Sequence, residues 1–519
     1  MAKARCFLII LVAVGLLASW PVGTIAQSEQ DLTKDAAGRI IEDPAFGVRS
    51  VVPTDWQDAG GGIYTRGTPP EDPVLMAIQS APIGVDGLWS ALLPQFALSD
   101  IPEAVGNLST DHFEWTLYAF DVEQPDAVLA GQLALTEMEG TSYLVLVMSD
   151  ALEADVLREQ AFLPAVMALQ AVKPGAMPVP ASLEGAVDLD AFLTEFVGDA
   201  DGGVVGRITR DGETTSSAVG VANADGDPLG IDTAFRVGSI SKPFVSTMVL
   251  QLVDEGLVDL DAPLSTYLPE TSVGGDVTVR WLLSHRSGIP NITDQPDFFG
   301  DAFEDLDRSL STDEVLDYIA DVPAGEPDQV FSYSNTNYIL LGQLLEAVGG
   351  SDLDSALQIR IAEPLGLEAT TFDVDGSRMP DTLASPWAGD VFQGDPTVPY
   401  ESISSAAWSA GSLVSTTADL ATFLTALYEG ELVSDELLVE MLSTGPEGYG
   451  LGIASTDLML GSVGSDSFYG HNGGIPGYIS FMAGDPETGD IVVLLSNNEA
   501  LDPHAAAAEI LRAWAVADG

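Results

Sequence analysis

The sequence predicts a multidomain α+β chain, in which a small α+β domain precedes a larger domain built from an antiparallel sheet, flanking helices and a helical lobe. The first observation is length, because 519 residues exceed one ordinary hydrophobic core. The second is a Pro/Gly-rich stretch, KPGAMPVPAS at 173–182, which is typical of a linker. The third is that strand patterns lie at both ends of the region after this linker, while helical patterns fill its middle.

Composition is that of a globular protein, with 46% hydrophobic and 19% charged residues. The net charge is extreme, −61, from 18 basic and 79 acidic side chains. Such a surface repels nucleic acid and anionic membranes, so neither is expected as a partner. Solubility is one explanation of the acidity. Adaptation to high salt, where screening relieves the self-repulsion, is the other.

Residues 1–26 are predicted to be a secretory signal peptide. Lys3 and Arg5 precede the apolar run FLIILVAVGLLA, and small residues before Gln27 suit a cleavage site. The run is too short to predict a membrane span, so no stable span is expected after its removal, with an uncleaved anchor as the alternative. Cys6, the only cysteine, lies inside this segment, which leaves the mature chain without disulfides or cysteine metal ligands. The protein is therefore expected to be secreted, extracellular or periplasmic.

Residues 27–172 are predicted to form the small α+β domain after a polar lead-in. Its helices are expected at 88–98 and 156–172, the second of them kinked by Pro164. Its strands are expected in five segments rich in β-branched and aromatic residues, at 46–52, 74–81, 113–122, 127–135 and 141–149. No nucleophile–base pair stands out, so the domain is interpreted as a spacer or as a binding domain for an unknown partner.

The larger domain is expected over 187–519, after a linker at 173–186, and its central feature is the unit Ser239-x-x-Lys242. Pro243 is tolerated in the first turn of a helix, so a helix is predicted to begin just before it and to end at Gly256. Residues three apart share one helix face, which brings the hydroxyl and the amine together. A serine becomes nucleophilic beside a base, and burial turns a lysine into one. A surface lysine at a helix start is the alternative.

Two further motifs follow this unit. Tyr333-Ser334-Asn335 stands just ahead of an apolar helical pattern that ends at Gly349-Gly350, and His471-Asn472-Gly473-Gly474 stands beside a strand pattern.

Together the three motifs resemble the serine β-lactamase and penicillin-recognising superfamily, in the branch of class C β-lactamases, D-alanyl-D-alanine carboxypeptidases, D-aminopeptidases and esterases. The resemblance extends over the region from about 187 to the end of the chain. It is carried there by further segments that stand in the expected order: VTVRWLLSHRSGIP, FSYSNTNYILLGQLLE, AEPLGL, SAGSLVSTTADLATFL and YGLGI. It implies a β-lactamase-like fold for the larger domain.

The resemblance also implies a catalytic role for three residues. Ser239 is acylated, Lys242 stays partly unprotonated through burial, and Tyr333 relays protons as a phenol whose pKa nearby positive charge pulls down. No metal and no cofactor is needed.

The same resemblance implies substrate-binding roles for Asn335, His471 and Gly473, and an oxyanion hole made by the backbone N–H groups of Ser239 and Gly474. β-Lactamases usually have lysine where this chain has His471, and a histidine is a weaker, pH-dependent cation. This departure weakens the case for β-lactam hydrolysis.

The remaining histidines are given no catalytic role. His285, in LLSHRSG, is expected to be structural, and His504 is expected to be exposed on the C-terminal helix. No His/Asp/Glu cluster has the spacing of a zinc site.

The function predicted is a secreted serine hydrolase that works through an acyl-enzyme on Ser239, with D-amino-acid peptides or related amides as substrates. The first alternative is a carboxylesterase with the same three residues, and the second is a β-lactamase. A catalytically inactive binding or scaffold protein is the alternative from a different class. The predicted partner is a small-molecule or peptide substrate.

Overall fold

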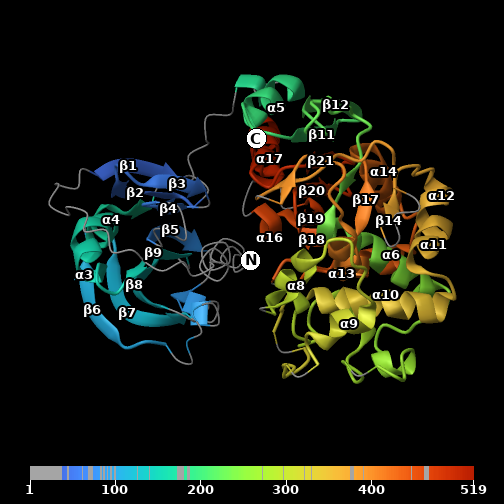
Figure 1. Ribbon diagram of the computed structural model, residues 1–519, viewed down its shortest axis with the longest axis horizontal. Coiled ribbons are helices and arrows are strands. Elements are labelled where there is room, and N and C mark those ends of the chain that lie inside the picture. Colours follow the sequence, from blue (N-terminus) through green and yellow to red (C-terminus); the bar gives the residue numbers. More distant parts are fainter. Residues whose placement is uncertain are drawn as a thin grey trace. The chain divides into compact units, whose positions relative to one another are not determined.

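The chain divides into two compact units, 1–178 and 179–519, in the computed structural model (Figure 1). The division falls inside the segment 173–186 that the sequence marks as a linker. The signal peptide, nearly all of the lead-in and most of the linker lie outside the described residues. These are 38–171, 181–183 and 187–518, without 44–45, 61, 68–73, 82–83, 86–87, 90–91, 94–95, 97, 99–100, 111, 125–126, 139–140, 272, 296, 321, 329, 374–378, 390, 446 and 461–466.

The first unit is built on a seven-stranded antiparallel sheet. Its strands, in spatial order, are β3 (Gln57–Gly60), β4 (Ile63–Thr65), β5 (Leu75–Ala81), β9 (Thr141–Asp150), β8 (Ala127–Met138), β7 (Glu114–Gln124) and β6 (Ala104–Ser109). A smaller sheet joins β1 (Gly38–Asp43), β2 (Val48–Pro53) and β10 (Gln170–Ala171). All five predicted strand segments are strands, four in the larger sheet and the one at 46–52 in the smaller, because β-branched and aromatic residues suit strands.

Alternate residues of this sheet serve two separate cores. In β9, Val145 and Val147 pack on one face, and Leu144 and Leu146 pack on the other. The first face meets a helical segment made of α3 (Ala154–Leu157), a π-helical turn η1 (Arg158–Phe162) and α4 (Leu163–Ala168). Pro164 opens α4, so the predicted kink takes the form of the π turn before it.

The second unit is organised around a six-stranded antiparallel sheet to which both ends of the unit contribute. Its spatial order is β12 (Glu213–Gly220), β11 (Gly203–Arg210), β21 (Ile491–Ser496), β20 (Tyr478–Gly484), β19 (Tyr469–Ile475) and β18 (Ala454–Ser455). The sequence prediction of one sheet built from both ends of the larger domain is thereby confirmed, and so is its antiparallel arrangement with flanking helices.

Two helical layers cover the faces of this sheet. Val204 and Leu494 face the layer of α5 (Leu189–Val197) and α17 (Pro503–Asp518), while Val205 and Leu495 face the layer that holds α6 (Ser241–Asp254) and α14 (Thr417–Tyr428). Figure 1 shows α17 beside β20 and β21.

Further helical elements complete the unit, most of them in the helical lobe. They are η2 (Ala181–Leu183), η4 (Leu264–Thr266), α7 (Val279–Leu283), η5 (Ile292–Asp294), α8 (Phe298–Glu304), α9 (Thr312–Asp317), α10 (Asn335–Gly349), α11 (Leu353–Leu357), η6 (Gln358–Ala362), α12 (Glu363–Leu365), α13 (Glu401–Gly411), α15 (Asp435–Met441) and α16 (Thr456–Leu460). Two small sheets join β13 (Phe235–Arg236) with β17 (Leu413–Ser415) and β14 (Thr371–Phe372), and β15 (Trp387–Ala388) with β16 (Phe392–Gln393). Among the described helices none is long and apolar enough to cross a bilayer.

Helix α6 lies in the centre of the unit. The sequence predicts a core-facing stripe through Phe244, Met248 and Leu252, but every residue from 241 to 250 is buried, on all faces of the helix. A helix that neighbouring elements cover on all sides buries the side chains of its first turn as well. Lys242, in that turn, therefore has no exposed surface.

One buried ion pair ties the start of this helix to the rest of the unit. Arg236 in β13 donates to Asp373, and both side chains are more than nine-tenths buried. Its guanidinium also bonds Ser404 Oγ at 2.9 Å and lies 4.1 Å from the centre of the Tyr400 ring. Removing one member of such a pair leaves the other charge buried without compensation.

We therefore expect Asp373→Asn to destabilise the second unit by about 3–5 kcal/mol, because it leaves the Arg236 charge uncompensated in the core. Glu255→Gln is the matched control. It breaks the more exposed pair with Arg360 and is expected to cost less than about 1 kcal/mol. The midpoint of thermal unfolding of the full chain measures both, and equal shifts for the two variants would contradict the expectation.

Candidate active site

The three motifs meet at one hydroxyl group. Ser239 lies in the turn η3 (Gly238–Ile240) that leads directly into α6, and Lys242 lies in the first turn of that helix. Asn335 is the first residue of α10, and Tyr333 lies two residues before it. Ser239 Oγ is 2.9 Å from Lys242 Nζ and 2.9 Å from the Tyr333 hydroxyl.

The amine of Lys242 has three polar neighbours and no exposure to solvent. Besides Ser239 Oγ, Nζ donates to Asn335 Oδ1 at 2.9 Å and to the carbonyl oxygen of Ala410 at 2.8 Å. Burial lowers its pKa well below the usual value for lysine. A neutral amine has two N–H groups and one lone pair. Since the amide oxygen and the carbonyl accept only, they take both N–H groups, and the lone pair is left for the hydroxyl proton of Ser239.

The backbone of α13 makes one of these contacts possible. Trp408 has φ 35°, so the chain leaves helical geometry there, two residues before Ala410. The carbonyl group of Ala410 lies beyond this break and accepts from Lys242. Sequence analysis missed this oxygen, because a backbone carbonyl leaves no signal in residue type.

The amide of Asn335 is held in one orientation. Its Nδ2 donates to Asn291 Oδ1 at 3.3 Å and to Thr293 Oγ1 at 3.2 Å, and its backbone N–H donates to the same Asn291 oxygen at 2.9 Å. Both amide protons are therefore used inside the protein, and Oδ1 must face Lys242. Asn291 and Thr293 were not singled out from the sequence, although they directly follow the quoted segment ending in SGIP.

The phenol of Tyr333 differs from the expectation. Burial raises its pKa above the usual value for tyrosine, and the hydrogen bond with Ser239 acts in the opposite sense. Nearby positive charge was expected to pull this pKa down. A largely neutral Lys242 cannot supply that charge, so Tyr333 stays protonated and donates its O–H to Ser239 Oγ.

The glycines of the third motif allow β19 to lie directly against the serine. A Cβ on Gly473 would lie 2.0 Å from the carbonyl oxygen of Val237, and 3.1 Å from Ser239 N. Gly238 has φ 52°, and a Cβ there would lie 2.8 Å from Gly474 N. Gly474 is exposed, next to the serine. The two backbone N–H groups predicted to bind an oxyanion therefore lie on segments in direct contact.

The side chain of His471 is buried and does not face the pocket beside Ser239. The side chain is 2% exposed, its Nδ1 lies 2.5 Å from the carbonyl oxygen of Asn472, and its Nε2 lies 3.0 Å from the Tyr449 hydroxyl. Nδ1 therefore carries the proton, and Nε2 accepts. Burial lowers the pKa of the imidazole to about 3. The predicted pH-dependent cation is thus neutral near pH 7, and neither nitrogen is left for a substrate.

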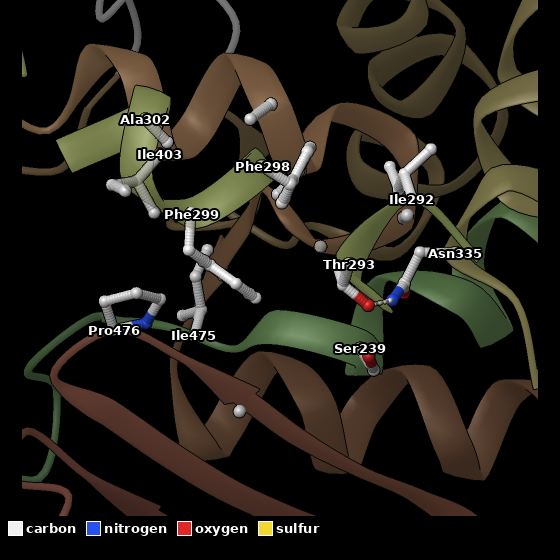
Figure 2. Close-up of a pocket in the computed structure, with 15 residues that line it drawn as sticks. Ser239, Ile292, Thr293, Phe298, Phe299, Ala302, Asn335, Ile403, Ile475 and Pro476 are labelled. Carbon is white, nitrogen blue, oxygen red and sulfur yellow. Dashed lines mark hydrogen bonds between the residues drawn. The ribbon is translucent and has the colours of Figure 1, made fainter. Parts of the chain in front are cut away.

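A pocket opens on Ser239 and Asn335 (Figure 2). Its volume of about 120 Å³ suits a group of several heavy atoms. Figure 2 shows Ser239, Thr293 and Asn335 together at one side of this pocket, with apolar side chains beyond them. The apolar lining comes from Ile292, Phe298, Phe299, Ala302, Ile403, Ala406, Ala407, Ala410, Ile475 and Pro476. None of the described residues that line this pocket is charged.

The two remaining histidines of the second unit pack against other side chains. His285 is fully buried beside Tyr333. His504 was expected to be exposed, but its side chain is only 21% exposed, pairs with Asp502 and packs near Phe481, because α17 covers the sheet. Within the described residues no cluster of three or more His, Cys, Asp or Glu side chains could hold a metal ion.

Comparison with known proteins identifies the family, since the beta-lactamase profile matches residues 189–516, more than half of the chain. The chain belongs to the beta-lactamase family. Penicillin-binding protein 4 of Amycolatopsis lactamdurans is 28% identical over 322 residues, which cover 55% of this chain and 78% of that protein. Esterase EstB of Burkholderia gladioli is 32% identical over 201 residues, covering 36% of this chain and 50% of the esterase.

The solved structure of an amidase is also similar to this chain. The D-amino acid amidase of Ochrobactrum anthropi SV3, complexed with D-phenylalanine, matches with a TM-score of 0.54 and 28% identity. The match covers 63% of this chain and 98% of the amidase. Together with the family match, these relatives show that this member of the beta-lactamase family is a serine hydrolase.

The depressed pKa of His471 predicts acid sensitivity. The unfolded chain binds a proton on this histidine below about pH 6.5, whereas the folded chain binds it only near pH 3. Between these values the unfolded state holds more protons, so stability falls as pH falls, by about 1.4 kcal/mol per pH unit.

His471→Asn keeps an N–H for the carbonyl of Asn472 and cannot take up that proton. We expect the unfolding free energy of this variant to depend less steeply on pH between 6.5 and 4 than that of wild type. Urea unfolding at several pH values measures the difference, and parallel curves would contradict it.

Proposed function

We propose that this serine hydrolase cleaves amides of apolar D-amino acids, and short peptides that begin with them, through an acyl-enzyme on Ser239. The observation that carries the proposal is an uncharged, apolar pocket that opens directly on a serine whose hydroxyl faces a fully buried amine, the pKa of which burial lowers. The D-amino acid amidase among the solved structures supports the choice of substrate.

In the proposed mechanism Lys242 takes the proton of Ser239 Oγ as the oxygen attacks the carbonyl carbon. The backbone N–H groups of Ser239 and Gly474 bind the oxyanion that develops. The Tyr333 hydroxyl, being a neutral donor, gives its proton to the leaving nitrogen, and the ammonium of Lys242 restores the proton on the phenol. Water then adds to the acyl-enzyme, with Lys242 again as the base, and the released acid leaves Ser239 protonated.

The pocket disfavours substrates whose carboxylate must be bound by a positively charged side chain of the protein. A β-lactam or a carboxypeptidase substrate presents a carboxylate, and neither the pocket lining nor the neutral His471 offers it a cation. The free ammonium of an amino acid amide meets no such obstacle, since the net charge of −61 attracts cations. β-Lactam hydrolysis is therefore placed behind amide hydrolysis.

Ester hydrolysis is the second candidate, because the same attack on an ester needs less help at the leaving group and Esterase EstB is among the relatives.

We also propose that the protein is exported, a proposal that rests on the apolar segment within residues 1–26. The binding role of residues 27–172 remains a prediction.

A substrate panel tests the proposal. We expect turnover of D-phenylalaninamide above that of L-phenylalaninamide, slower or comparable turnover of p-nitrophenyl acetate, and little turnover of a chromogenic cephalosporin. Ser239→Ala should remove every activity, because it removes the hydroxyl that forms the acyl-enzyme. An active ester hydrolase that leaves D-amides untouched would favour the esterase. A folded wild-type protein that fluorophosphonate does not label would favour the inactive scaffold.

The pocket wall generates a second prediction. Phe299 is 44% exposed and lines the pocket, so Phe299→Ala should remove apolar contact without disturbing the core. We expect kcat/KM for D-phenylalaninamide to fall about tenfold, from the loss of roughly 1–2 kcal/mol of burial, with little change for D-alaninamide. Ile359→Ala, an exposed apolar residue of η6 outside the pocket, is the control. Equal losses on both amides would show that the side chain of the substrate lies elsewhere.

A further inference from the structure

His285 occupies an unusual place for a residue without an assigned role. It is fully buried and lies in the turn after α7 with φ 55°, a backbone conformation that few residues other than glycine adopt. Asparagine and histidine tolerate it better than most side chains. A position that combines full burial with this backbone conformation points to a constraint set by its neighbours.

Those neighbours lie on both sides of Tyr333. The N–H of Ser332 donates to the carbonyl oxygen of His285 at 2.8 Å, and the N–H of Ser334 donates to His285 Nδ1 at 3.1 Å. Between these two bonds, the ring of Tyr333 lies against the imidazole, with ring centres 4.2 Å apart and planes tilted by 34°. One residue thus holds the backbone before Tyr333, the backbone after it and its ring.

The hydrogen bonds also fix the protonation of the imidazole. Since Nδ1 accepts from Ser334, the proton of the neutral ring is on Nε2, which has no hydrogen-bond partner among the described residues. The rings of Phe331, Tyr338 and Tyr449 surround the imidazole. Burial lowers its pKa, so the ring stays neutral. A neutral imidazole places no positive charge near the amine of Lys242, so His285 can support Tyr333 without changing the charge of the site.

We propose that His285 is a positioning residue that holds the Tyr333 hydroxyl within hydrogen-bond reach of Ser239 Oγ. It touches neither substrate nor the attacking oxygen, and acts through the phenol alone. A misplacement of about 1 Å at a reacting group can cost a hundredfold in rate, so loss of this support is expected to slow acylation. This inference rests on the role given to Tyr333 in the proposed mechanism.

The test is a double-mutant cycle on the rate of acylation of Ser239 by D-phenylalaninamide, measured beside the rate at which a fluorophosphonate phosphonylates the same oxygen and releases fluoride. His285→Asn tolerates the left-handed backbone and removes the stacked ring. We expect it to lower the acylation rate about 10- to 100-fold, with kcat affected more than KM. In a Tyr333→Phe background the same change should cost less than about twofold, because the hydroxyl that it positions is gone. His112→Asn, an exposed histidine of the first unit, is the matched control.

The outcomes separate the two ideas. If Tyr333→Phe acylates as fast as wild type, the role given to the phenol in the proposed mechanism is wrong. If Tyr333→Phe is slow but His285→Asn acts equally in both backgrounds, or not at all, His285 does not work through Tyr333 and the positioning proposal fails.

A second measurement needs no variant at this position and covers the case in which His285→Asn does not fold. Nitrogen NMR of the wild-type protein with labelled histidine should show a buried imidazole, near tyrosine rings, that carries its proton on Nε2 across pH 5–8. A proton on Nδ1 would break the bond from Ser334 and overturn the proposal.

Discussion

The site depends on the burial of one amine. Lys242 has no contact with solvent because α6 is covered on every side, and its two permanent acceptors are the amide oxygen of Asn335 and the carbonyl of Ala410. An ammonium in this place would lose its hydration and gain no carboxylate in return, so the neutral form is favoured. The lone pair that results has one place to point, which is the hydroxyl of Ser239. Reactivity at the serine is thus a consequence of packing around a helix.

Each contact to that amine is set by a different part of the fold. The helical lobe supplies Asn335, whose orientation is fixed by Asn291, and the break in α13 at Trp408 precedes the carbonyl of Ala410. The sheet supplies β19, whose glycines allow it to lie against the turn that carries Ser239. The active site therefore forms only when the helical lobe and the sheet are packed together. Its residues come from segments that lie far apart in the sequence.

The sequence predicted what residue type encodes, and missed what the backbone and burial decide. Spaced motifs gave Ser239, Lys242 and Tyr333, and turn residues such as Gly256 gave the end of a helix. Burial of α6 on all sides was missed, because an amphipathic pattern understates how much a central helix is covered. The pKa of Tyr333 was predicted to fall but is raised, and His471 was predicted to be a pH-dependent cation but is neutral near pH 7. Both properties depend on the exclusion of solvent, which no sequence motif records.

The charge distribution also bears on specificity. The chain carries a net charge of −61, yet the described lining of its pocket holds no charged side chain, and the histidine at the position where β-lactamases usually have lysine is buried and neutral. Discrimination then works by two separate effects. The long-range field disfavours the approach of anions, while the pocket selects for apolar bulk and leaves any buried carboxylate without a partner. A substrate that is neutral or cationic near its scissile carbonyl, with an apolar side chain, is opposed by neither effect.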